Sequence, residues 1–217
     1  MIPATLEALN WLTDDIAQLW LAPQQACNWQ AGDYLTMTPD AALDARPFSI
    51  ANAPNAASRI ELHIRNTGDD WYNRLFAATP GDTLLLGAPQ QQYPLPRGDR
   101  PVIFVAGGTG FAPFKALTEQ LLGDGFNQPI HFYWGARTAK DLYQHEVISA
   151  WATHNDGLHY IPVLSEEAWP GRTGLVADAV LEDFDSLAGL EVYLCGPWPM
   201  VESARIHFEH TGADLIH

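Results

Sequence analysis

The sequence is poor in cysteine, and this excludes several kinds of site. Only Cys27 and Cys195 occur among the 217 residues, far apart and in no metal-ligand spacing. Neither a disulfide framework nor an iron–sulfur cluster can be assembled from two such residues. This cysteine usage fits a reducing, cytoplasmic compartment.

Basic residues are also scarce. The chain has 11 Lys and Arg against 26 Asp and Glu, which gives a formal net charge of −15. A surface of that charge repels phosphate backbones and anionic lipid headgroups. We therefore expect neither nucleic acid nor a membrane surface among the partners.

Long apolar runs are absent as well. No stretch reaches the roughly 18 consecutive apolar residues expected of a membrane-spanning helix. The N-terminal segment has no basic start and carries Glu7, Asp14 and Asp15, which argues against a signal peptide. We expect a soluble cytoplasmic protein, and at this length two modest domains are favoured over one large domain.

The first hundred residues form short apolar segments separated by turn formers. Residues 4–12 and 16–22 flank Thr13-Asp14-Asp15 and predict a hairpin. Four further strand candidates follow, each bounded by glycine, proline or asparagine: residues 33–39, 46–52, 59–65 and 82–88. Many short strands at such spacing are typical of an antiparallel barrel or sandwich.

Two segments interrupt this pattern. Residues 69–79 carry Trp71, Tyr72, Leu75 and Phe76 at helical spacing and predict one helix inserted between strands. Residues 94–101 concentrate proline, glycine and charge, as interdomain linkers do. The predicted domains are therefore residues 1–97 and residues 98–217.

In the second domain, predicted strands alternate with predicted helices. Residues 102–107 form a continuous apolar segment typical of a strand buried on both faces. Strands are predicted next at 130–136, 158–165 and 191–196, alternating with helices that end at 122 and that span 142–153, 174–183 and 199–210. Such alternation predicts parallel crossover units and an open, doubly wound sheet.

A glycine-rich loop joins the first strand of this domain to its first helix. It reads Gly107-Gly108-Thr109-Gly110-Phe111-Ala112-Pro113. Backbone amides and the helix dipole favour an anion at such a place, so the loop predicts a phosphate site. It matches neither the Gly-x-Gly-x-x-Gly fingerprint nor the P-loop. A tight turn without a ligand is the alternative.

Two further motifs flank this loop, Arg46-Pro47-Phe48-Ser49 upstream and Cys195-Gly196-Pro197-Trp198-Pro199-Met200 downstream. In this order, the three motifs resemble the ferredoxin–NADP reductase superfamily, and most of all its bacterial NAD(P)H:flavin oxidoreductases. The resemblance covers nearly the whole chain. It implies a flavin-binding antiparallel barrel followed by a nicotinamide-binding doubly wound domain, the same division that the periodicity predicts.

The resemblance also implies roles for residues of the barrel. Arg46 would face the ribityl or phosphate side of the flavin, Phe48, after Pro47, would pack against the isoalloxazine, and Ser49 would hydrogen-bond N5. A hydroxyl suits N5 because it can donate or accept. His63 and Ile64 would lie along the flavin edge, unless they only form one half-buried strand.

In the second domain the resemblance places the nicotinamide nucleotide. The glycine loop would bind its pyrophosphate, and Cys195 would sit beside the nicotinamide C4 and shape the pocket without acting as a nucleophile. Gly196, Pro197 and Met200 belong to the same motif. A small buried residue at a strand end is the other interpretation of Cys195.

The adenosine end is less defined. Gly135 and Arg137 end the second parallel strand, where a Rossmann-type domain meets the adenosine ribose. No carboxylate follows that strand directly, and Arg137 or Lys140 could accept a 2′-phosphate or be ordinary solvated charges. NADH and NADPH both remain open.

One departure from the family concerns the motif that binds the FAD pyrophosphate. Members that retain FAD place Gly-x-x-Ser/Thr at the start of the inserted helix, where this chain has Gly68-Asp69-Asp70-Trp71. The hydroxyl is missing, and the two carboxylates repel a phosphate, although they also suit a first helical turn. We expect riboflavin, FMN or FAD to exchange as substrates.

A second departure concerns the C-terminal end. Relatives continue beyond the segment that ends here at His217 into a final strand and an aromatic tail, which leaves the back of the nicotinamide pocket undefined.

These motifs predict an NAD(P)H:flavin oxidoreductase that transfers a hydride from the nicotinamide C4 to N5 of a loosely bound flavin, with Ser49 and Cys195 at the reacting rings. The alternative is a reductase that retains FAD and passes electrons to a protein partner such as an oxygenase or ferredoxin. A regulatory module that only binds the nucleotides is a third interpretation. No metal is expected, because His207 and His210 lack a third ligand.

Overall fold

The structure, a computed structural model, describes residues 1–96 and 98–216. The chain divides into two compact units, residues 1–95 with 115–120 and the remaining described residues. Residue 97, inside the expected linker and at the expected domain boundary, lies outside the described residues, as does the terminal His217. No helix in the described part of the chain is both long enough and apolar enough to cross a membrane.

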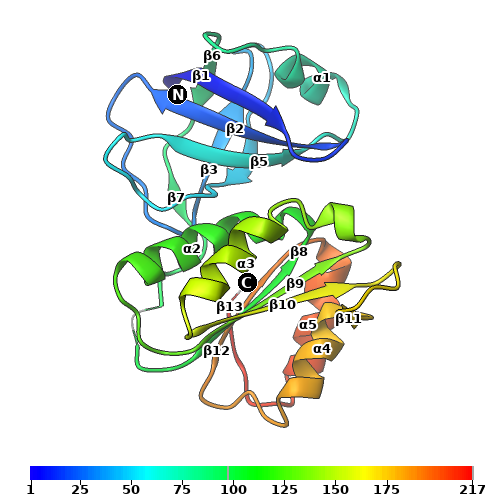
Figure 1. Ribbon diagram of the computed structural model, residues 1–217. Helices are drawn as coiled ribbons and strands as arrows, with labels where there is room; N and C mark the ends of the chain where they lie inside the picture. The colour runs from blue at the N-terminus through cyan, green and yellow to red at the C-terminus, as the bar shows by residue number, and fades with distance from the viewer. Residues whose placement is uncertain (97, 217) are drawn as a thin grey trace. The chain divides into compact units, whose positions relative to one another are not determined.

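The first unit is built on a seven-stranded antiparallel sheet (Figure 1). The strand order is β4-β3-β6-β1-β2-β5, with β7 paired to β3. A bridge between Ile50 and Leu62 joins the two ends of this order, so the sheet forms a nearly closed barrel. The strands are β1 (Ile2–Trp11), β2 (Ile16–Pro23), β3 (Asp33–Thr38), β4 (Arg46–Ser49), β5 (Ile60–Arg65), β6 (Thr83–Leu86) and β7 (Gln90–Gln91).

Local chemistry explains the predicted hairpin and helix of this unit, and the structure confirms both. The turn between β1 and β2 is held by Thr13, whose Oγ1 accepts the amide of Ile16 at 2.9 Å. Helix α1 (Asp70–Phe76) begins after Asp69, whose carboxylate caps the amide of Tyr72 at 3.1 Å. Trp71 is buried against the barrel core, so tertiary packing stabilises this short helix.

The second unit contains a six-stranded parallel sheet in the order β11-β10-β9-β8-β12-β13. Helices cover it on both faces, as predicted (Figure 1). The strands are β8 (Val102–Gly107), β9 (Ile130–Ala136), β10 (Leu158–Leu164), β11 (Arg172–Thr173), β12 (Glu191–Cys195) and β13 (Asp214–Ile216). The helices are α2 (Phe111–Gly123), α3 (His145–His154), α4 (Val176–Asp183) and α5 (Trp198–Phe208).

The apolar strand β8 shows why a doubly wound sheet forms here. Ile103 and Val105 pack in a core shared with α4 and α5. Phe104, on the opposite face, stacks on Phe114 of α2 at 4.9 Å between ring centroids. Both faces of β8 are therefore buried, which an unbroken apolar strand allows.

The strand order places a switch point at β8. The chain runs outward from β8 to β9 and β10 on one side, then returns to β12 on the other. Ligands of doubly wound sheets bind at the carboxyl ends of the strands at such a point. Here those ends are Gly107 and Cys195, and both belong to predicted motifs.

The sequence pattern misses the shortest strands. It predicts no strand at β7, β11 or β13, which are two or three residues long. A run of this length carries no readable periodicity, and each forms because a longer neighbour offers an unpaired edge. β13 pairs in parallel with β12, so a further strand follows α5 within the present sequence.

Candidate functional site

The glycine loop lies at the switch point and packs directly against the Cys195 motif. A 3₁₀ turn, η1 (Gly108–Gly110), connects β8 to α2. A Cβ on Gly110 would lie 2.2 Å from the Cys195 carbonyl oxygen, and one on Gly107 would lie 2.4 Å from Met200 Sδ. Gly108 adopts a φ of 52°, which suits glycine. Gly110 is therefore required by the close approach of two backbone segments, and Gly107 by the side chain of Met200. Both bring the predicted phosphate loop and the Cys195 motif together.

Residues on the outer side of this loop differ in accessibility. Gly108 and Thr109 are half-buried, as are Cys195 and Met200, while Pro197 is exposed. The side chain of Phe111 is fully buried, and Pro113 is buried in the first turn of α2. Phe111 and Pro113 thus shape the helix start, and only main-chain groups there can face a ligand.

The segment that follows β9 contacts the segment that follows β10. Gly135 is close-packed, because a Cβ there would lie 2.9 Å from Val176 Cβ. Arg137 is exposed, and its carbonyl accepts the amide of Glu166 at 2.9 Å. The carboxylate of Glu167 accepts the amide of Ala139 at 2.7 Å. One carboxylate, that of Glu167 in the segment after β10, thus reaches the segment after β9, which sequence order alone did not reveal.

In the first unit, a pocket of about 420 Å³ is lined by Tyr34, Pro47, Phe48, Ser49 and Gln92. Antiparallel pairing of β3 with β4 sets Tyr34 opposite Ser49. Ser49 Oγ donates to Gln92 Oε1 at 3.3 Å, and the Tyr34 hydroxyl donates to Gln90 Oε1 at 2.9 Å. The pocket combines an aromatic wall with polar groups, as a site for a flat heteroaromatic ring would. Sequence analysis did not identify Gln92 or Tyr34.

Arg46 is already engaged by the protein. Its guanidinium pairs with Asp69 at 2.8 Å and lies over the rings of Trp71 and Tyr72, 4.7 and 4.8 Å from their centroids. The bond to Arg46 lowers the pKa of Asp69, so this carboxylate is ionised at neutral pH. Asp69 therefore already neutralises the guanidinium that the resemblance places at the ribityl or phosphate side of the flavin.

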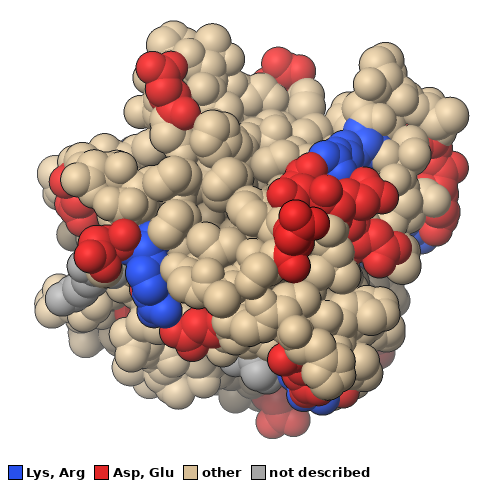
Figure 2. Space-filling view, turned by 90° about the horizontal axis from the view of Figure 1, so that it is seen from below, with Lys and Arg blue, Asp and Glu red and all other residues tan. Residues whose placement is uncertain are grey.

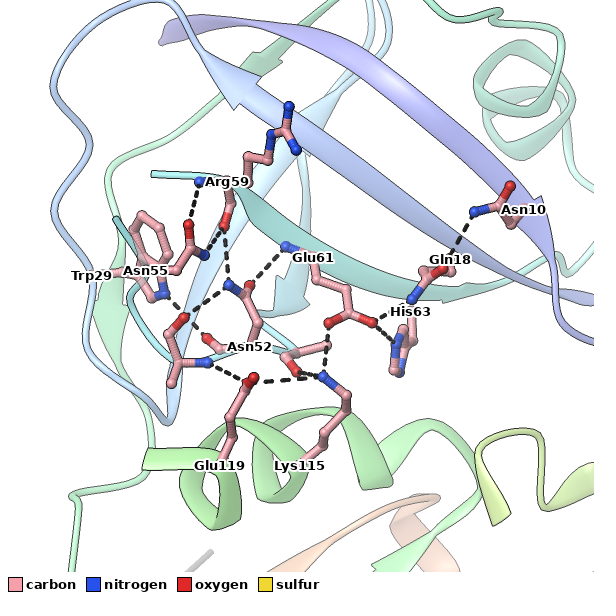
Figure 3. Close-up of polar contacts among 12 residues, drawn as sticks. Asn10, Gln18, Trp29, Asn52, Asn55, Arg59, Glu61, His63, Lys115 and Glu119 are labelled. Carbon is pink, nitrogen blue, oxygen red and sulfur yellow. Dashed lines mark hydrogen bonds and ion pairs between the residues drawn. The ribbon is translucent and has the colours of Figure 1, made fainter. Parts of the chain in front are cut away.

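His63 and Ile64 keep their side chains buried. Ile64 packs in the barrel core, and His63 Nε2 lies 2.8 Å from Glu61 Oε1 (Figure 3). Burial lowers the pKa of His63, and the bond to Glu61 only partly opposes this. Any contact of these two residues with a ligand must therefore use main-chain groups on the edge of β5 beyond Leu62.

Glu61 is the centre of this buried polar cluster. Its other carboxylate oxygen pairs with Lys115 Nζ at 2.8 Å, and Gln18 Nε2 donates to Oε1 at 2.6 Å (Figure 3). Burial raises the pKa of Glu61, but its bonds to His63 and Lys115 outweigh burial and lower it to about 2. Lys115 also donates to the Ala51 carbonyl at 3.0 Å, so the cluster is satisfied and structural.

Neither a metal-ligand cluster nor the surface charge points to a further candidate site. Within the described residues, no group of three or more His, Cys, Asp or Glu side chains could hold a metal ion. On the face drawn in Figure 2, acidic side chains outnumber basic ones, in keeping with the net charge of −15. The two candidate sites are therefore the ring-sized pocket and the glycine loop.

Comparisons with known proteins agree with this arrangement. Residues 104–205 match the family model of the oxidoreductase NAD-binding domain. The chain is 34% identical over 216 residues to CDP-6-deoxy-L-threo-D-glycero-4-hexulose-3-dehydrase reductase of Yersinia pestis, covering 97% of this chain and 65% of that protein. It is 31% identical over 216 residues to NAD(P)H-flavin reductase of Aliivibrio fischeri, covering 95% of this chain and 91% of that protein.

A solved structure is similar over nearly the whole chain. The Amycolatopsis cytochrome P450 reductase GcoB matches with a TM-score of 0.89 and 27% identity, over 99% of this chain and 68% of that one. The chain thus spans about two thirds of the Yersinia protein and of GcoB, and nine tenths of the Aliivibrio protein. The chain belongs to the ferredoxin–NADP reductase superfamily, among the relatives of bacterial NAD(P)H-flavin reductases.

Proposed function

We propose that this chain is an NAD(P)H:flavin oxidoreductase that takes up its flavin as a dissociable substrate. Residues 1–97 would bind riboflavin, FMN or FAD, and residues 98–217 would bind NADH or NADPH. The observation that carries the proposal is the Arg46–Asp69 pair beside the ring-sized pocket. The pocket would hold the flavin ring, whereas Arg46, next to the pocket residue Pro47, is neutralised by Asp69, so a flavin phosphate would gain little from it. The cysteine usage supports a cytoplasmic location.

The pocket residues fit an isoalloxazine ring. Phe48 offers an apolar face, and the hydroxyl of Ser49 can donate to or accept from a ring nitrogen. Bound flavin and nicotinamide supply the redox chemistry, a hydride transfer from C4 to N5. The chain itself orients the rings and excludes water; no side chain needs to act as a general acid for that step.

The glycine loop fits a pyrophosphate. Gly107 and Gly110 let the loop pack tightly against the Cys195 motif. Amides at the start of a helix lack intrahelical acceptors and favour an anion. Cys195 is half-buried at the end of β12, where a small thiol leaves space for a nicotinamide ring. Arg137 is exposed at the end of β9 and would face the adenosine half of the nucleotide.

The proposed activity has a direct test. Purified protein is mixed with NADH or NADPH, and absorbance at 340 nm is followed after riboflavin, FMN or FAD is added. We expect oxidation that requires added flavin. No oxidation with any flavin, by protein free of bound flavin, would contradict the proposal.

Ser49→Ala is expected to slow hydride transfer about tenfold, the effect of losing roughly one neutral hydrogen bond. Flavin affinity should change less, because the aromatic wall remains. Single-turnover reduction of saturating riboflavin, followed by stopped-flow absorbance, measures the rate. Tyr34→Phe is the matched control, since it removes a hydroxyl of the same pocket that is bonded to Gln90. An unchanged single-turnover rate in Ser49→Ala would remove Ser49 from the mechanism.

Asp69→Ser is expected to strengthen binding of FMN and FAD about tenfold relative to riboflavin. Serine keeps the helix cap but releases Arg46 and removes a charge that repels phosphate. Quenching of flavin fluorescence gives the three dissociation constants. Asp40→Asn, which removes the carboxylate paired with Arg74, is the control for lost surface charge. Equal gains for all three flavins, or wild-type protein that retains stoichiometric FAD through gel filtration, would count against the proposal.

The second candidate function is electron transfer to a protein partner. The likeness to the Yersinia reductase and to GcoB, both longer than this chain, favours it. In that case the purified protein would retain flavin and turn over free riboflavin poorly. Gel filtration of the wild-type protein, which shows whether flavin is retained, and the 340 nm assay with free riboflavin distinguish the two functions.

A further inference from the structure

One aromatic residue outside the predicted motifs contacts the glycine loop from behind. Trp134, on β9, is fully buried, and its indole Nε1 donates to the carbonyl oxygen of Gly108 at 3.0 Å. A residue with no exposed surface cannot touch a bound nucleotide. Its influence on a ligand must pass through the loop.

Neighbouring rings fix the indole in place. Phe111 stacks on Trp134 with centroids 3.9 Å apart and planes 17° from parallel. Tyr143 meets the same indole edge-on, at 5.2 Å and 88°. The indole N–H therefore has one direction available, and it points at the Gly108 carbonyl.

Peptide planarity carries this contact to the outer side of the loop. The Gly108 carbonyl and the Thr109 amide belong to one trans peptide, in which C=O and N–H point in opposite directions. With the carbonyl held toward Trp134, the Thr109 N–H points away from the buried rings. Thr109 lies in η1, the 3₁₀ turn that leads into α2, and the amides at the start of such a turn lack intrahelical acceptors.

We propose that Trp134 is a positioning residue that turns the Thr109 amide toward the pyrophosphate of the nicotinamide nucleotide. The inference rests on the proposed function. The buried indole would fix the direction of a main-chain donor, the Thr109 N–H, without touching the nucleotide itself. The Phe111 amide also donates to the Gly108 carbonyl, so the indole N–H is one of two donors that hold the 108–109 peptide. Without the indole N–H the peptide keeps only the donor from its own turn, and the direction of the Thr109 amide toward the anion is less fixed.

The test compares Trp134→Phe with Trp169→Phe. Trp169, in the same unit, also donates its indole N–H to a main-chain carbonyl, but to that of Arg172 and not to the glycine loop. We expect Trp134→Phe to weaken ADP-ribose binding roughly tenfold in calorimetry, the effect of one hydrogen bond. KM for NAD(P)H should rise similarly, whereas kcat at saturation and riboflavin affinity stay within twofold. Trp169→Phe should leave all four unchanged.

A second variant separates the hydrogen bond from the volume of the ring. Benzothienylalanine incorporated at position 134 keeps the bicyclic shape and lacks the N–H, so it should reproduce the loss of ADP-ribose affinity. Unchanged ADP-ribose affinity in this variant would overturn the inference, as would an equal loss of riboflavin affinity. Trp134-dependent ADP-ribose binding by protein that reduces no flavin would support the inference and contradict the proposed function. A wild type that does not bind ADP-ribose would overturn both.

Discussion

Gly110→Ala is expected to lower kcat/KM for NAD(P)H at least about 100-fold. The new Cβ would lie 2.2 Å from the Cys195 carbonyl oxygen and 2.8 Å from the Gly196 amide nitrogen, and both are backbone atoms that cannot rotate away. The loop and the Cys195 motif must therefore move apart. Misplacing a binding group by about 1 Å can cost 100-fold in rate, and here the phosphate loop and the nicotinamide pocket are displaced together. Steady-state kinetics at saturating riboflavin measures the loss.

Gly123→Ala is the matched control for this substitution. Gly123 ends the helix that follows the loop, and a Cβ there would meet nothing within 4 Å. Alanine at an unstrained helical position is neutral or mildly stabilising, so activity should stay at the wild-type level. Riboflavin affinity should be unchanged in both variants, because the flavin pocket lies in the barrel. A kcat/KM for NAD(P)H within threefold of wild type in Gly110→Ala would contradict the close packing described here.

The fold and the glycine loop were predictable because their signals are local. The continuous apolar run of β8 and the short bounded segments of the barrel each specify an element within a few residues. Gly107 and Gly110 stand in sequence beside the helix start that they serve. The family motifs around them are equally local, which is why Ser49 and Cys195 could be singled out in advance.

The other residues of the two candidate sites come together through contacts between segments far apart in the sequence, and the order of residues does not reveal these contacts. Gln92 reaches Ser49 across 43 residues, and Glu167 reaches Ala139 across 28. Trp134 was visible as a strand residue, but its bond to Gly108 requires the register between β8 and β9. Identifying such residues needs strand order and register, and a short sequence window specifies neither.

The Glu61–Lys115 pair is another long-range contact that a short sequence window does not reveal. We expect this pair to contribute strongly to the stability of the fold. They lie 54 residues apart in sequence, and their side chains are only 2% and 8% exposed. We expect Glu61→Gln to lower the free energy of unfolding by about 3 kcal/mol, the low end of the cost of breaking a buried ion pair. The buried Lys115 ammonium would keep its bond to the Ala51 carbonyl, while the Glu119 carboxylate lies 3.9 Å away and is 41% exposed, so it compensates the charge poorly. Chemical denaturation followed by intrinsic fluorescence measures the change.

The pH dependence of this contribution follows from the pKa of Glu61. The folded-state pKa is about 2, below the ordinary value of 4.5, so the stabilisation is present above about pH 4.5 and is lost as the pH falls toward 2. His63, whose pKa burial lowers, adds stability that is lost as the pH falls below 6.5. Glu61→Gln should therefore flatten the stability profile between about pH 4.5 and 2.

Two comparisons distinguish a buried ion pair from an ordinary one. Glu7→Gln removes the partner of Arg59 in the same unit, where the two side chains are 30% and 53% exposed, and it should cost less than about 1 kcal/mol. Adding Lys115→Met to Glu61→Gln removes the buried ammonium, while the introduced amide can still bond to Gln18 and His63, so the double variant should recover much of the loss. A cost for Glu61→Gln no larger than that for Glu7→Gln would mean that water reaches Lys115 and that the pair does not hold β5 against the 115–120 segment.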